Sequence, residues 1–174
     1  MNLAVIDNFL PYPNVVRSWA LSQNFYDCKE MSEITKETNT WPGVRSLQVT
    51  DLDIDYANVV LSRIALIAMN NFGVSSNLEI GSSFQMCGKQ DGDSWIHEDH
   101  DVSLAGILYL TPNAPIESGT TMYTPDPHVP VDVIGNVYNR LVMYASNTPH
   151  KSNSYFGDTI ENSRLTQVFF IKGS

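Results

Sequence analysis

The sequence predicts an α+β fold in which N-terminal helices pack on a C-terminal double sheet of mainly antiparallel strands. Two observations predict it: a helical period dominates before Gly73, and short β-type runs separated by turn residues follow it. The chain has 174 residues, of which 43% are hydrophobic, so it is long enough to bury a core without disulfides. We therefore expect a single domain over 1–174, with a helical flanking region at 1–73 and a β core at 74–174.

Two segments before Gly73 carry helical patterns, one near 13–24 and one near 53–72. Prolines flank the start of the first segment, and proline suits a first helical turn. The second segment starts with acidic residues, which are favourable at the positive end of a helix dipole, and Gly73 is a typical stop. Apolar residues recur in the second segment at spacings of three and four: Ile54, Ala57, Leu61, Ile64 and Ala68. Both helices are expected to bury one face against the β core.

Six short runs after Gly73 are typical of strands. Clusters of glycine, proline and other turn residues separate them, and no helical pattern lies between them. The runs cover 83–87, 104–110, 120–123, 129–134, 141–145 and 165–171. Several short strands at close spacing indicate a sandwich or a barrel made largely of antiparallel strands.

Composition and charge argue against several classes of protein. The 10 Lys and Arg stand against 19 Asp and Glu and give a net charge of −9, which repels phosphate backbones and disfavours general nucleic-acid binding. The longest apolar runs, such as 104–110, are far below the ~20 residues of a membrane span. Cys28 and Cys87 form neither a disulfide framework nor a metal-binding pair, and no signal-peptide pattern is present. We therefore expect a cytoplasmic protein that does not insert into membranes.

The segment Trp95–His100, with the sequence WIHEDH, combines two histidines with two acidic residues and is the strongest candidate for a functional site in the chain. His97 and Asp99 are two residues apart, so both side chains point the same way on an extended segment and can hold one metal ion. With one more nitrogen ligand they form the facial triad that suits non-heme Fe(II) and leaves coordination positions open. Taken alone, His-x-Asp is a weak pattern, and a solvated acidic loop is the commoner explanation.

Three further histidines compete for the third ligand position. His150 is the best candidate, because it follows a hydrophobic strand at the point where the chain becomes polar; the alternative is a surface histidine beside Lys151. His128 lies in a proline-rich turn, where an exposed side chain is expected. His100 points away from His97 on an extended segment, so we expect it outside the ligand set.

Arg164 and Thr166 share one face of the last strand with Val168 and Phe170. An arginine on an apolar face is unfavourable unless an anion pairs with it. A guanidinium with a hydroxyl two residues further on is well shaped to hold a carboxylate. The alternative is an Arg164 that merely starts the strand and faces water.

In their order along the chain, these motifs resemble the Fe(II)- and 2-oxoglutarate-dependent dioxygenase superfamily. The matching residues are His97, Asp99, His150, Arg164 and Thr166. Members of this superfamily carry an H-x-D…H metal triad, followed some ten to fifteen positions later by an arginine that binds the co-substrate. The separation between His150 and Arg164 fits that pattern.

Further segments extend the resemblance to prolyl-hydroxylase-like members. The run 104–112 (LAGILYLTP) is similar to their strand after the first half of the triad, and it includes Tyr109. The run 117–123 (ESGTTMY) resembles their Gly-Gly-Thr turn, with Ser118 in place of the first glycine. The segments 5–11 and 41–46 are similar to small members found in phages and marine bacteria. A phage-encoded chain is expected in the cytoplasm of the host.

The resemblance implies a double-stranded β-helix, or jelly roll, of about eight strands. It implies that one Fe(II) is held by the three catalytic, metal-binding residues His97, Asp99 and His150. It also implies that the distal carboxylate of 2-oxoglutarate is held by Arg164, Thr166 and Tyr109. The expected reaction uses O2, releases succinate and CO2, and hydroxylates an unidentified substrate, either a small molecule or a protein side chain; ascorbate is a candidate accessory reductant.

Two other functions remain open at this stage. A cupin-like metal enzyme can use similar ligands without 2-oxoglutarate, but such sites usually need three or four histidines, so Asp99 and Arg164 count against it. A non-enzymatic jelly roll, structural or carbohydrate-binding, predicts neither tight iron binding nor 2-oxoglutarate turnover. The sequence does not indicate an oligomeric state.

Overall fold

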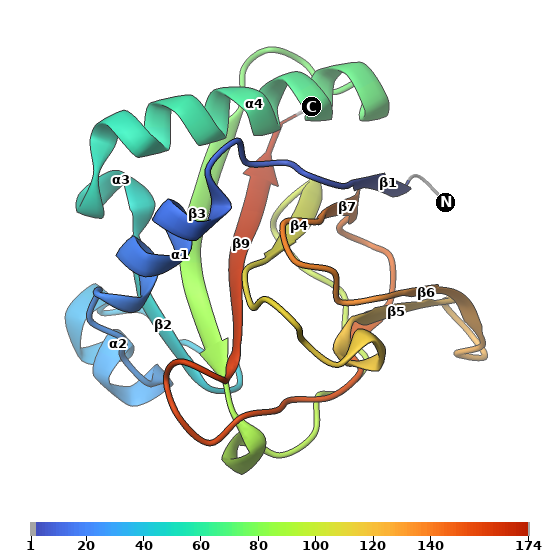
Figure 1. The fold of residues 1–174 in the computed structure, drawn as a ribbon. Coiled ribbons are helices and arrows are strands. Elements are labelled where there is room, and N and C mark those ends of the chain that lie inside the picture. Colours follow the sequence, from blue (N-terminus) through green and yellow to red (C-terminus); the bar gives the residue numbers. More distant parts are fainter. Residues whose placement is uncertain (1–2, 174) are drawn as a thin grey trace.

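The computed structural model describes residues 3–173, which form nine strands, four α-helices and two short 3₁₀ turns (Figure 1). The strands are β1 (Leu3–Ile6), β2 (Val44–Gln48), β3 (Glu79–Cys87), β4 (Leu104–Tyr109), β5 (Thr120–Tyr123), β6 (Pro130–Ile134), β7 (Leu141–Ala145), β8 (His150–Ser152) and β9 (Arg164–Lys172). The helices are α1 (Pro13–Leu21), α2 (Cys28–Thr35), α3 (Val49–Leu52) and α4 (Ile54–Phe72).

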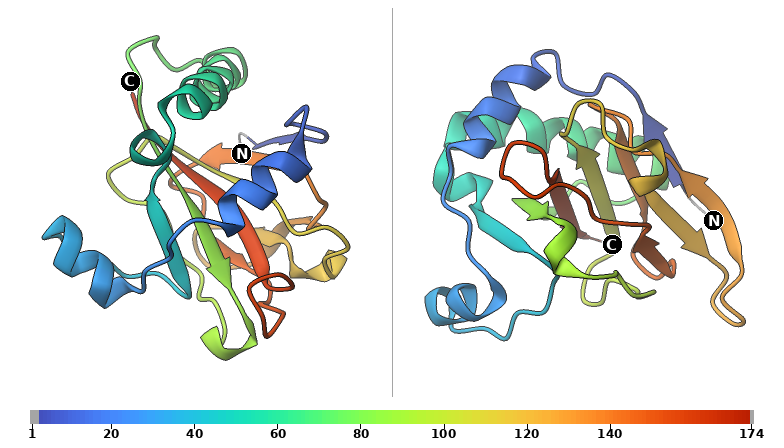
Figure 2. Two further views of the ribbon diagram at one scale, coloured as in Figure 1. Left: turned by 60° about the vertical axis from the view of Figure 1, so that its left-hand side comes forward. Right: turned by 60° about the horizontal axis from the view of Figure 1, so that its bottom comes forward.

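These strands form two sheets that face each other. The large sheet has six strands in the order β1-β7-β4-β9-β3-β2, and the small sheet has three in the order β6-β5-β8. All strand pairs in both sheets are antiparallel. Helices α1 and α4 lie on one side of the large sheet, and the small sheet lies on the other (Figures 1 and 2). The predicted α+β architecture, with helices on a double antiparallel sheet, is confirmed.

The two expected helices are present with slightly different ends. α1 stops at Leu21, three residues earlier than expected. α4 begins after Asp53, whose side chain accepts a hydrogen bond from the backbone N–H of Tyr56 at 2.9 Å. It ends at Gly73, which adopts a left-handed conformation with φ of 70°. Both α4 ends therefore follow the local signals in the sequence.

The N-terminal half differs from the expected purely helical flanking region. β1 pairs with β7 and β2 pairs with β3, so this half supplies both edge strands of the large sheet. A further helix, α2, begins at a capping box in which Asp27 and Glu30 bond reciprocally to each other's backbone N–H. The single-domain organisation stays a prediction.

An apolar core fills the space between the helices and the large sheet. Alternate residues of each strand point into it, as β-strand geometry requires, and α4 contributes its buried stripe. Fully buried members include Phe84, Leu108, Leu141, Phe169 and Ile64. Burying each such side chain contributes about 1.5–3 kcal/mol, so this layer is the main source of stability.

The opposite face of the large sheet points toward the small sheet. There Tyr109 of β4 and Tyr144 of β7 are buried together with Met122 and Ile134 of the small sheet. This second core is smaller, and a cavity borders it. Within residues 3–173, no helix has the length and apolar character to cross a membrane.

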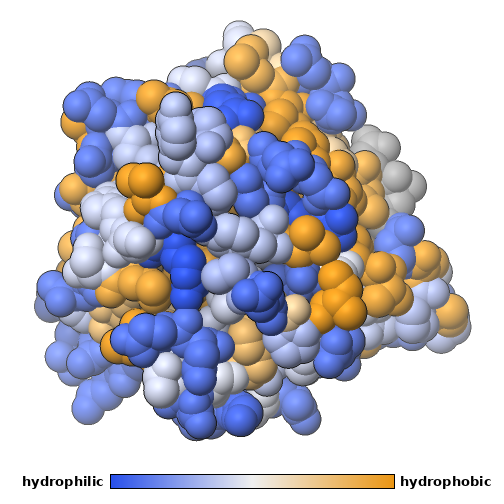
Figure 3. All heavy atoms as spheres, in the orientation of Figure 1, coloured by the Kyte–Doolittle hydropathy of each residue, from blue (hydrophilic) through white to orange (hydrophobic). Residues whose placement is uncertain are grey.

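On the face that carries α1 and α4, hydrophilic and hydrophobic side chains are interspersed (Figure 3).

Candidate functional site

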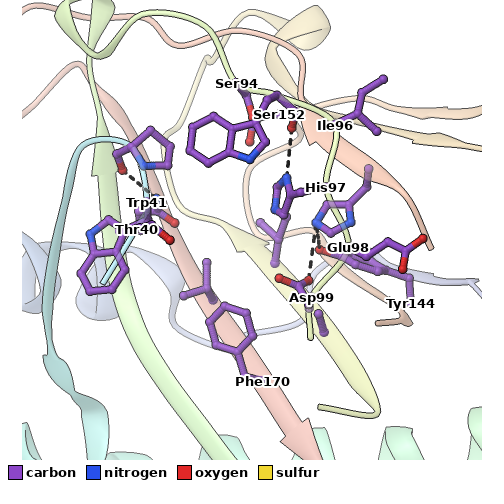
Figure 4. A pocket seen from close by; sticks show the side chains of 18 of the residues that line it. Thr40, Trp41, Ser94, Ile96, His97, Glu98, Asp99, Tyr144, Ser152 and Phe170 are labelled. Atoms are coloured by element: carbon purple, nitrogen blue, oxygen red, sulfur yellow. Dashed lines mark hydrogen bonds and ion pairs between the residues drawn. The ribbon is translucent and has the colours of Figure 1, made fainter. Parts of the chain in front are cut away.

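A cavity of about 580 Å³ opens on the face of the large sheet that is turned away from the helices. Its floor is formed by β3, β4 and β9, and the segment 94–100 lies along its wall. His97, Asp99 and Tyr144 lie close together at one side of it, and Trp41 and Phe170 lie at the other (Figure 4). All the strands that line the cavity belong to the two hydrogen-bonded sheets.

The structure brings His97, Asp99 and His150 together at this cavity. One ligand atom from each lies within 4.8 Å of the others, and the two imidazole centroids are 4.4 Å apart. The backbones of His97 and His150 form an isolated antiparallel bridge, with N–H to O=C distances of 3.0 and 2.9 Å. The N–H of Asp99 donates to the carbonyl of Ser146 at 3.0 Å. The loop that carries the first two residues is thus held against the strand that carries the third.

Hydrogen bonds orient both imidazole rings in the same way. Nδ1 of His97 donates to the carbonyl of Trp95 at 3.0 Å, and Nδ1 of His150 donates to the carbonyl of Thr148 at 2.9 Å. In each ring Nδ1 therefore carries the proton and Nε2 carries the lone pair, which is the usual arrangement of metal-binding histidines. Nε2 of His150 lies 3.5 Å from Oδ2 of Asp99 and accepts a 3.0 Å hydrogen bond from the Tyr144 hydroxyl.

Burial lowers the pKa of His150, and the nearby Asp99 carboxylate opposes this shift in part. The residue is only 4% exposed, so the alternative of a surface histidine beside Lys151 does not hold. A neutral imidazole is the form that binds a metal ion. Two such nitrogens and one carboxylate oxygen match the donor set of a non-heme iron site, so the residues present fit the metal that the sequence predicted.

The three residues predicted to hold the co-substrate form a second group, next to the cavity rather than on its surface. Arg164 is 3% exposed and its Cζ lies 5.4 Å from the ring centroid of Tyr109. Thr166 is the register partner of Tyr109 across β9 and β4. None of the three belongs to the cavity lining. They are adjacent to one another, but they are buried behind the surface that faces the metal ligands.

Arg164 has an incomplete set of partners. Its Nε donates to the carbonyl of Ser118 at 3.1 Å, while its Nη2 is buried and has no hydrogen-bond partner. The Tyr109 hydroxyl is bonded to Oγ1 of Thr120 at 2.7 Å, and burial raises the pKa of Tyr109. A buried guanidinium nitrogen without a partner is unfavourable. A carboxylate bound there would supply the missing acceptor.

Sequence reasoning missed several residues that support these groups. Tyr144 bonds His150, Thr120 bonds Tyr109, and Ser118 accepts from Arg164. Arg45 also lines the cavity. Ser118 and Thr120 lie in the turn that resembles Gly-Gly-Thr, which was the available signal for them; nothing in the sequence pointed to Tyr144.

The remaining histidines lie outside the triad, as expected. His100 and His128 are both exposed. His100 borders the cavity, and the ring of His128 lies 6.4 Å from that of Tyr123 in the loop between β5 and β6. Neither belongs to the group of close ligand atoms.

By sequence, the chain matches no family model and no curated protein. Its structure is similar to a prolyl-4-hydroxylase from Pseudomonas putida, with a TM-score of 0.64, 18% identity, and coverage of 98% of this chain and 92% of that one. It is also similar to an oxidoreductase of the 2OG-Fe(II) oxygenase family from Burkholderia pseudomallei, with a TM-score of 0.69, 11% identity, and coverage of 98% and 84%. A third similar structure is HygX from Streptomyces hygroscopicus, solved with nickel and 2-oxoglutarate bound. Its TM-score is 0.62 and its identity 13%, with coverage of 98% of this chain and 82% of that one.

The chain has the fold of the Fe(II)- and 2-oxoglutarate-dependent oxygenases, a double-stranded β-helix with flanking helices. Within that class, a prolyl-4-hydroxylase is among the structures that it resembles over nearly its whole length. The fold predicted from the sequence resemblance is confirmed.

Proposed function

We propose that this protein is a non-heme Fe(II)- and 2-oxoglutarate-dependent dioxygenase that hydroxylates a small molecule or a protein side chain. The observation that supports this most directly is the His97–Asp99–His150 group. Its ligand atoms lie within 4.8 Å of one another at the wall of a 580 Å³ cavity. The shared fold of solved oxygenases supports it further.

In this proposal, Nε2 of His97, a carboxylate oxygen of Asp99 and Nε2 of His150 hold the metal. Fe(II) bound there supplies the redox chemistry by which substrate, O2 and 2-oxoglutarate become hydroxylated product, succinate and CO2. Three protein ligands leave coordination positions for the co-substrate and O2. The Tyr144 hydroxyl, 3.0 Å from Nε2 of His150, uses the lone pair of that atom in this structure and would have to release it when a metal binds.

Arg164 is assigned to the distal carboxylate of 2-oxoglutarate, with Thr166 and Tyr109 as neighbouring hydroxyl donors. The unpartnered Nη2 of Arg164 supports this assignment. A carboxylate there completes a charge-assisted pair in a buried setting, where such pairs are strong. The pair also anchors the co-substrate at a fixed distance from the metal ligands, because Arg164 starts β9 and β9 is paired on both sides.

The remaining cavity residues orient the substrate and exclude water. Aromatic side chains border the space next to the metal ligands, among them Trp41, Trp95, Tyr155 and Phe170. Walls of this kind bury most of a bound small molecule. A dry cavity keeps a reactive oxidant away from water and side reactions.

One observation favours a second candidate, a cupin-like metal enzyme that does not use 2-oxoglutarate. Arg164, Thr166 and Tyr109 do not line the cavity. An enzyme of that kind keeps the metal group and uses Arg164 as a structural cation bonded to Ser118. The two candidates differ in whether succinate is released.

The test is an anaerobic Fe(II) titration of the wild type and of Asp99→Ala, followed by a 2-oxoglutarate-dependent succinate assay. Loss of a direct ligand is expected to weaken iron by about 100-fold or more, because even outer-shell changes cost 10–100-fold. Asp93→Ala removes an exposed carboxylate from the same loop and serves as the charge-matched control. Equal iron affinity in Asp99→Ala and wild type contradicts the metal site. Iron binding without any succinate release favours the cupin-like enzyme.

A further inference from the structure

Arg45 is a second guanidinium at the cavity, and none of the functions assigned above uses it. It lies on β2, where its backbone N–H and C=O bond to those of Tyr26 at 2.9 and 2.8 Å. Its side chain extends into the cavity lining. The Cζ atom lies 4.4 Å from the ring centroid of Trp41 and 5.5 Å from that of Phe170. Two aromatic rings thus replace much of the water that normally surrounds this cation.

Arg45 makes no direct ion pair among the described residues, although the Asp99 carboxylate at the same cavity acts on its charge from a longer distance. Its Nη2 donates to Oε1 of Gln85 at 3.2 Å, and its Nε is fully buried with no hydrogen-bond partner. No carboxylate among residues 3–173 lies within 4.0 Å of the guanidinium. Burial lowers the pKa of Arg45 to about 10, so it remains a cation at neutral pH. An unpaired, partly desolvated cation is unfavourable in a folded protein.

Trp41 carries a second unsatisfied donor at the same cavity. Its indole Nε1 is buried and has no partner among the described residues. Trp41 and Arg45 both line the cavity and are stacked on each other. Native proteins leave few buried donors unpaired, so two on neighbouring side chains indicate a ligand that brings acceptor oxygens.

The surrounding residues hold both donors in place. Nε2 of Gln85 donates to the carbonyl of Pro42 at 2.9 Å, which fixes the amide so that its oxygen faces Arg45. Gly43 has a φ of 70°, and a Cβ there would lie 2.2 Å from the carbonyl oxygen of Met86. Only glycine fits this turn. The turn places Trp41 over Arg45, so the pair is positioned by the backbone before any ligand arrives.

We propose that Arg45 and Trp41 recognise a carboxylate group of the substrate, which makes the substrate class of this cavity an organic acid. This inference rests on the proposed function insofar as it calls the bound molecule a substrate. The binding of a carboxylate at Arg45 does not depend on the proposed function. A carboxylate accepts hydrogen bonds from a guanidinium edge in a planar, charge-assisted pair and can also accept from an indole N–H. The aromatic walls then contact the apolar part of the same molecule.

The co-substrate is a different occupant from this carboxylate. Its predicted anchor, Arg164, lies on β9 next to Tyr109 and keeps an unpartnered Nη2 of its own. Arg45 lies on β2, two strands away, with β3 between them. Two separate cations with separate unsatisfied donors fit two carboxylates, one on the co-substrate and one on the substrate.

The experiment uses phenylacetate as the probe and phenylacetamide as its neutral counterpart, both titrated into the ¹⁵N-labelled full chain. The readouts are the Nε–H signal of Arg45 and the indole N–H signals of the three tryptophans. Trp19 packs against Tyr56 and Phe84 in the helix-side core and is the internal control. Titrations are run with Zn(II) and saturating 2-oxoglutarate, and again without either, so that the metal and Arg164 are occupied in one series only.

Phenylacetate is expected to shift the Arg45 and Trp41 signals saturably in both series, with Trp19 unchanged. Phenylacetamide is expected to bind at least tenfold more weakly, since it lacks the charge that forms the strong pair. Arg45→Gln is expected to weaken phenylacetate at least tenfold. Arg63→Gln removes the same charge from an exposed position over Phe9 and is expected to change the affinity by less than twofold.

Three results overturn the inference. The first is equal affinity of the wild type for phenylacetate and phenylacetamide, a result that does not depend on the folding of any variant. The second is that the Arg45 and Trp41 signals do not change. The third is displacement of phenylacetate by 2-oxoglutarate, which would assign Arg45 to the co-substrate. Failure of the proposed function is seen separately, as the absence of 2-oxoglutarate binding to the Zn(II) form while phenylacetate still binds at Arg45.

Discussion

Buried polar groups on the two faces of the large sheet differ in whether they have hydrogen-bond partners. On the helix-covered face, the Tyr56 hydroxyl donates to Oε1 of Gln167 at 2.6 Å, and Nε2 of Gln167 donates to Oγ of Ser82 at 3.0 Å. On the cavity face, Trp41, Arg45 and Arg164 each keep a buried nitrogen with no partner. Both faces belong to the same strands, so the difference does not come from the fold as a whole.

This contrast separates the stabilising layer from the binding layer. Polar groups that bond one another add stability and specify a unique packing. Donors left open lower stability until a ligand binds them, and proteins tolerate that at functional sites. Substitutions of equal chemical size are therefore expected to affect stability on the helix face and ligand binding on the cavity face.

The largest effect is expected from adjacent phenylalanines that point to opposite faces of β9. Phe169 is fully buried in the helix-side core, whereas Phe170 is only half-buried and borders the cavity. Phe169→Ala should lower the free energy of unfolding by about 3–5 kcal/mol, the usual loss for a buried aromatic side chain. Phe170→Ala should lose less than half as much. Urea denaturation of the two variants measures both, and equal losses would mean that the two faces contribute equally to stability.

The next effect concerns binding. Arg164→Lys keeps a positive charge but removes the planar fork, so 2-oxoglutarate is expected to bind about 30-fold more weakly, equivalent to about 2 kcal/mol. Iron affinity should change little, because Arg164 is not a ligand in the proposed site. Calorimetric titration of the Zn(II)-loaded proteins measures the affinity. Equal 2-oxoglutarate affinity in variant and wild type removes Arg164 from the co-substrate site.

A smaller effect is expected from the bonded network on the helix face. Tyr56→Phe removes the hydroxyl that bonds Gln167 and leaves a buried amide oxygen without that donor. The expected loss is about 1–2 kcal/mol of unfolding free energy, with metal and 2-oxoglutarate binding unchanged. Tyr12→Phe, at a residue that is 73% exposed, is the matched control and should be neutral. A neutral Tyr56→Phe would show that the network adds nothing.

The smallest effect belongs to neither face. Asp7 and Arg140 form an ion pair beside β1 and β7, with Nε 2.6 Å from Oδ1, and the Asp7 side chain is 52% exposed. The hydrogen bond from Arg140 lowers the pKa of Asp7, so its stabilisation is present above the unfolded pKa and is lost as pH falls through the folded pKa. Asp7→Asn should cost about 0.5 kcal/mol at pH 7. Unfolding at pH 7 and below pH ~3 should show the difference from wild type disappearing in acid.

Much of the fold follows from local patterns, and the exceptions have a common cause. The apolar stripe and caps of α4 and the alternating strands after Gly73 could be read directly. β1 and β8 have four and three residues, too few to show a period, and they are strands only because β7 and β5 pair with them. α2 is short and polar, but its capping box at Asp27 and Glu30 was a usable signal.

The candidate site divides in the same way. His97 and Asp99 were predicted from their two-residue spacing, and Arg164 from its place on the same strand face as apolar residues; both patterns are visible in the sequence. The environment of Arg45 depends on Trp41, in the loop before β2, and on Phe170, in β9. No local sequence pattern predicts that all three side chains lie together. Whether a buried donor lacks a partner is a property of the folded protein alone.

The bridge between His97 and His150 has a consequence for the choice of metal. Backbone hydrogen bonds of 2.9 and 3.0 Å set the spacing of the two histidines, so the backbone itself positions these two side chains. The affinity of a site with two nitrogen ligands and one oxygen ligand generally follows the order of divalent metals in which Fe(II) ranks below Ni(II), Cu(II) and Zn(II). In the proposed site, the metal bound is therefore expected to depend on which divalent ions are available as well as on the ligand set.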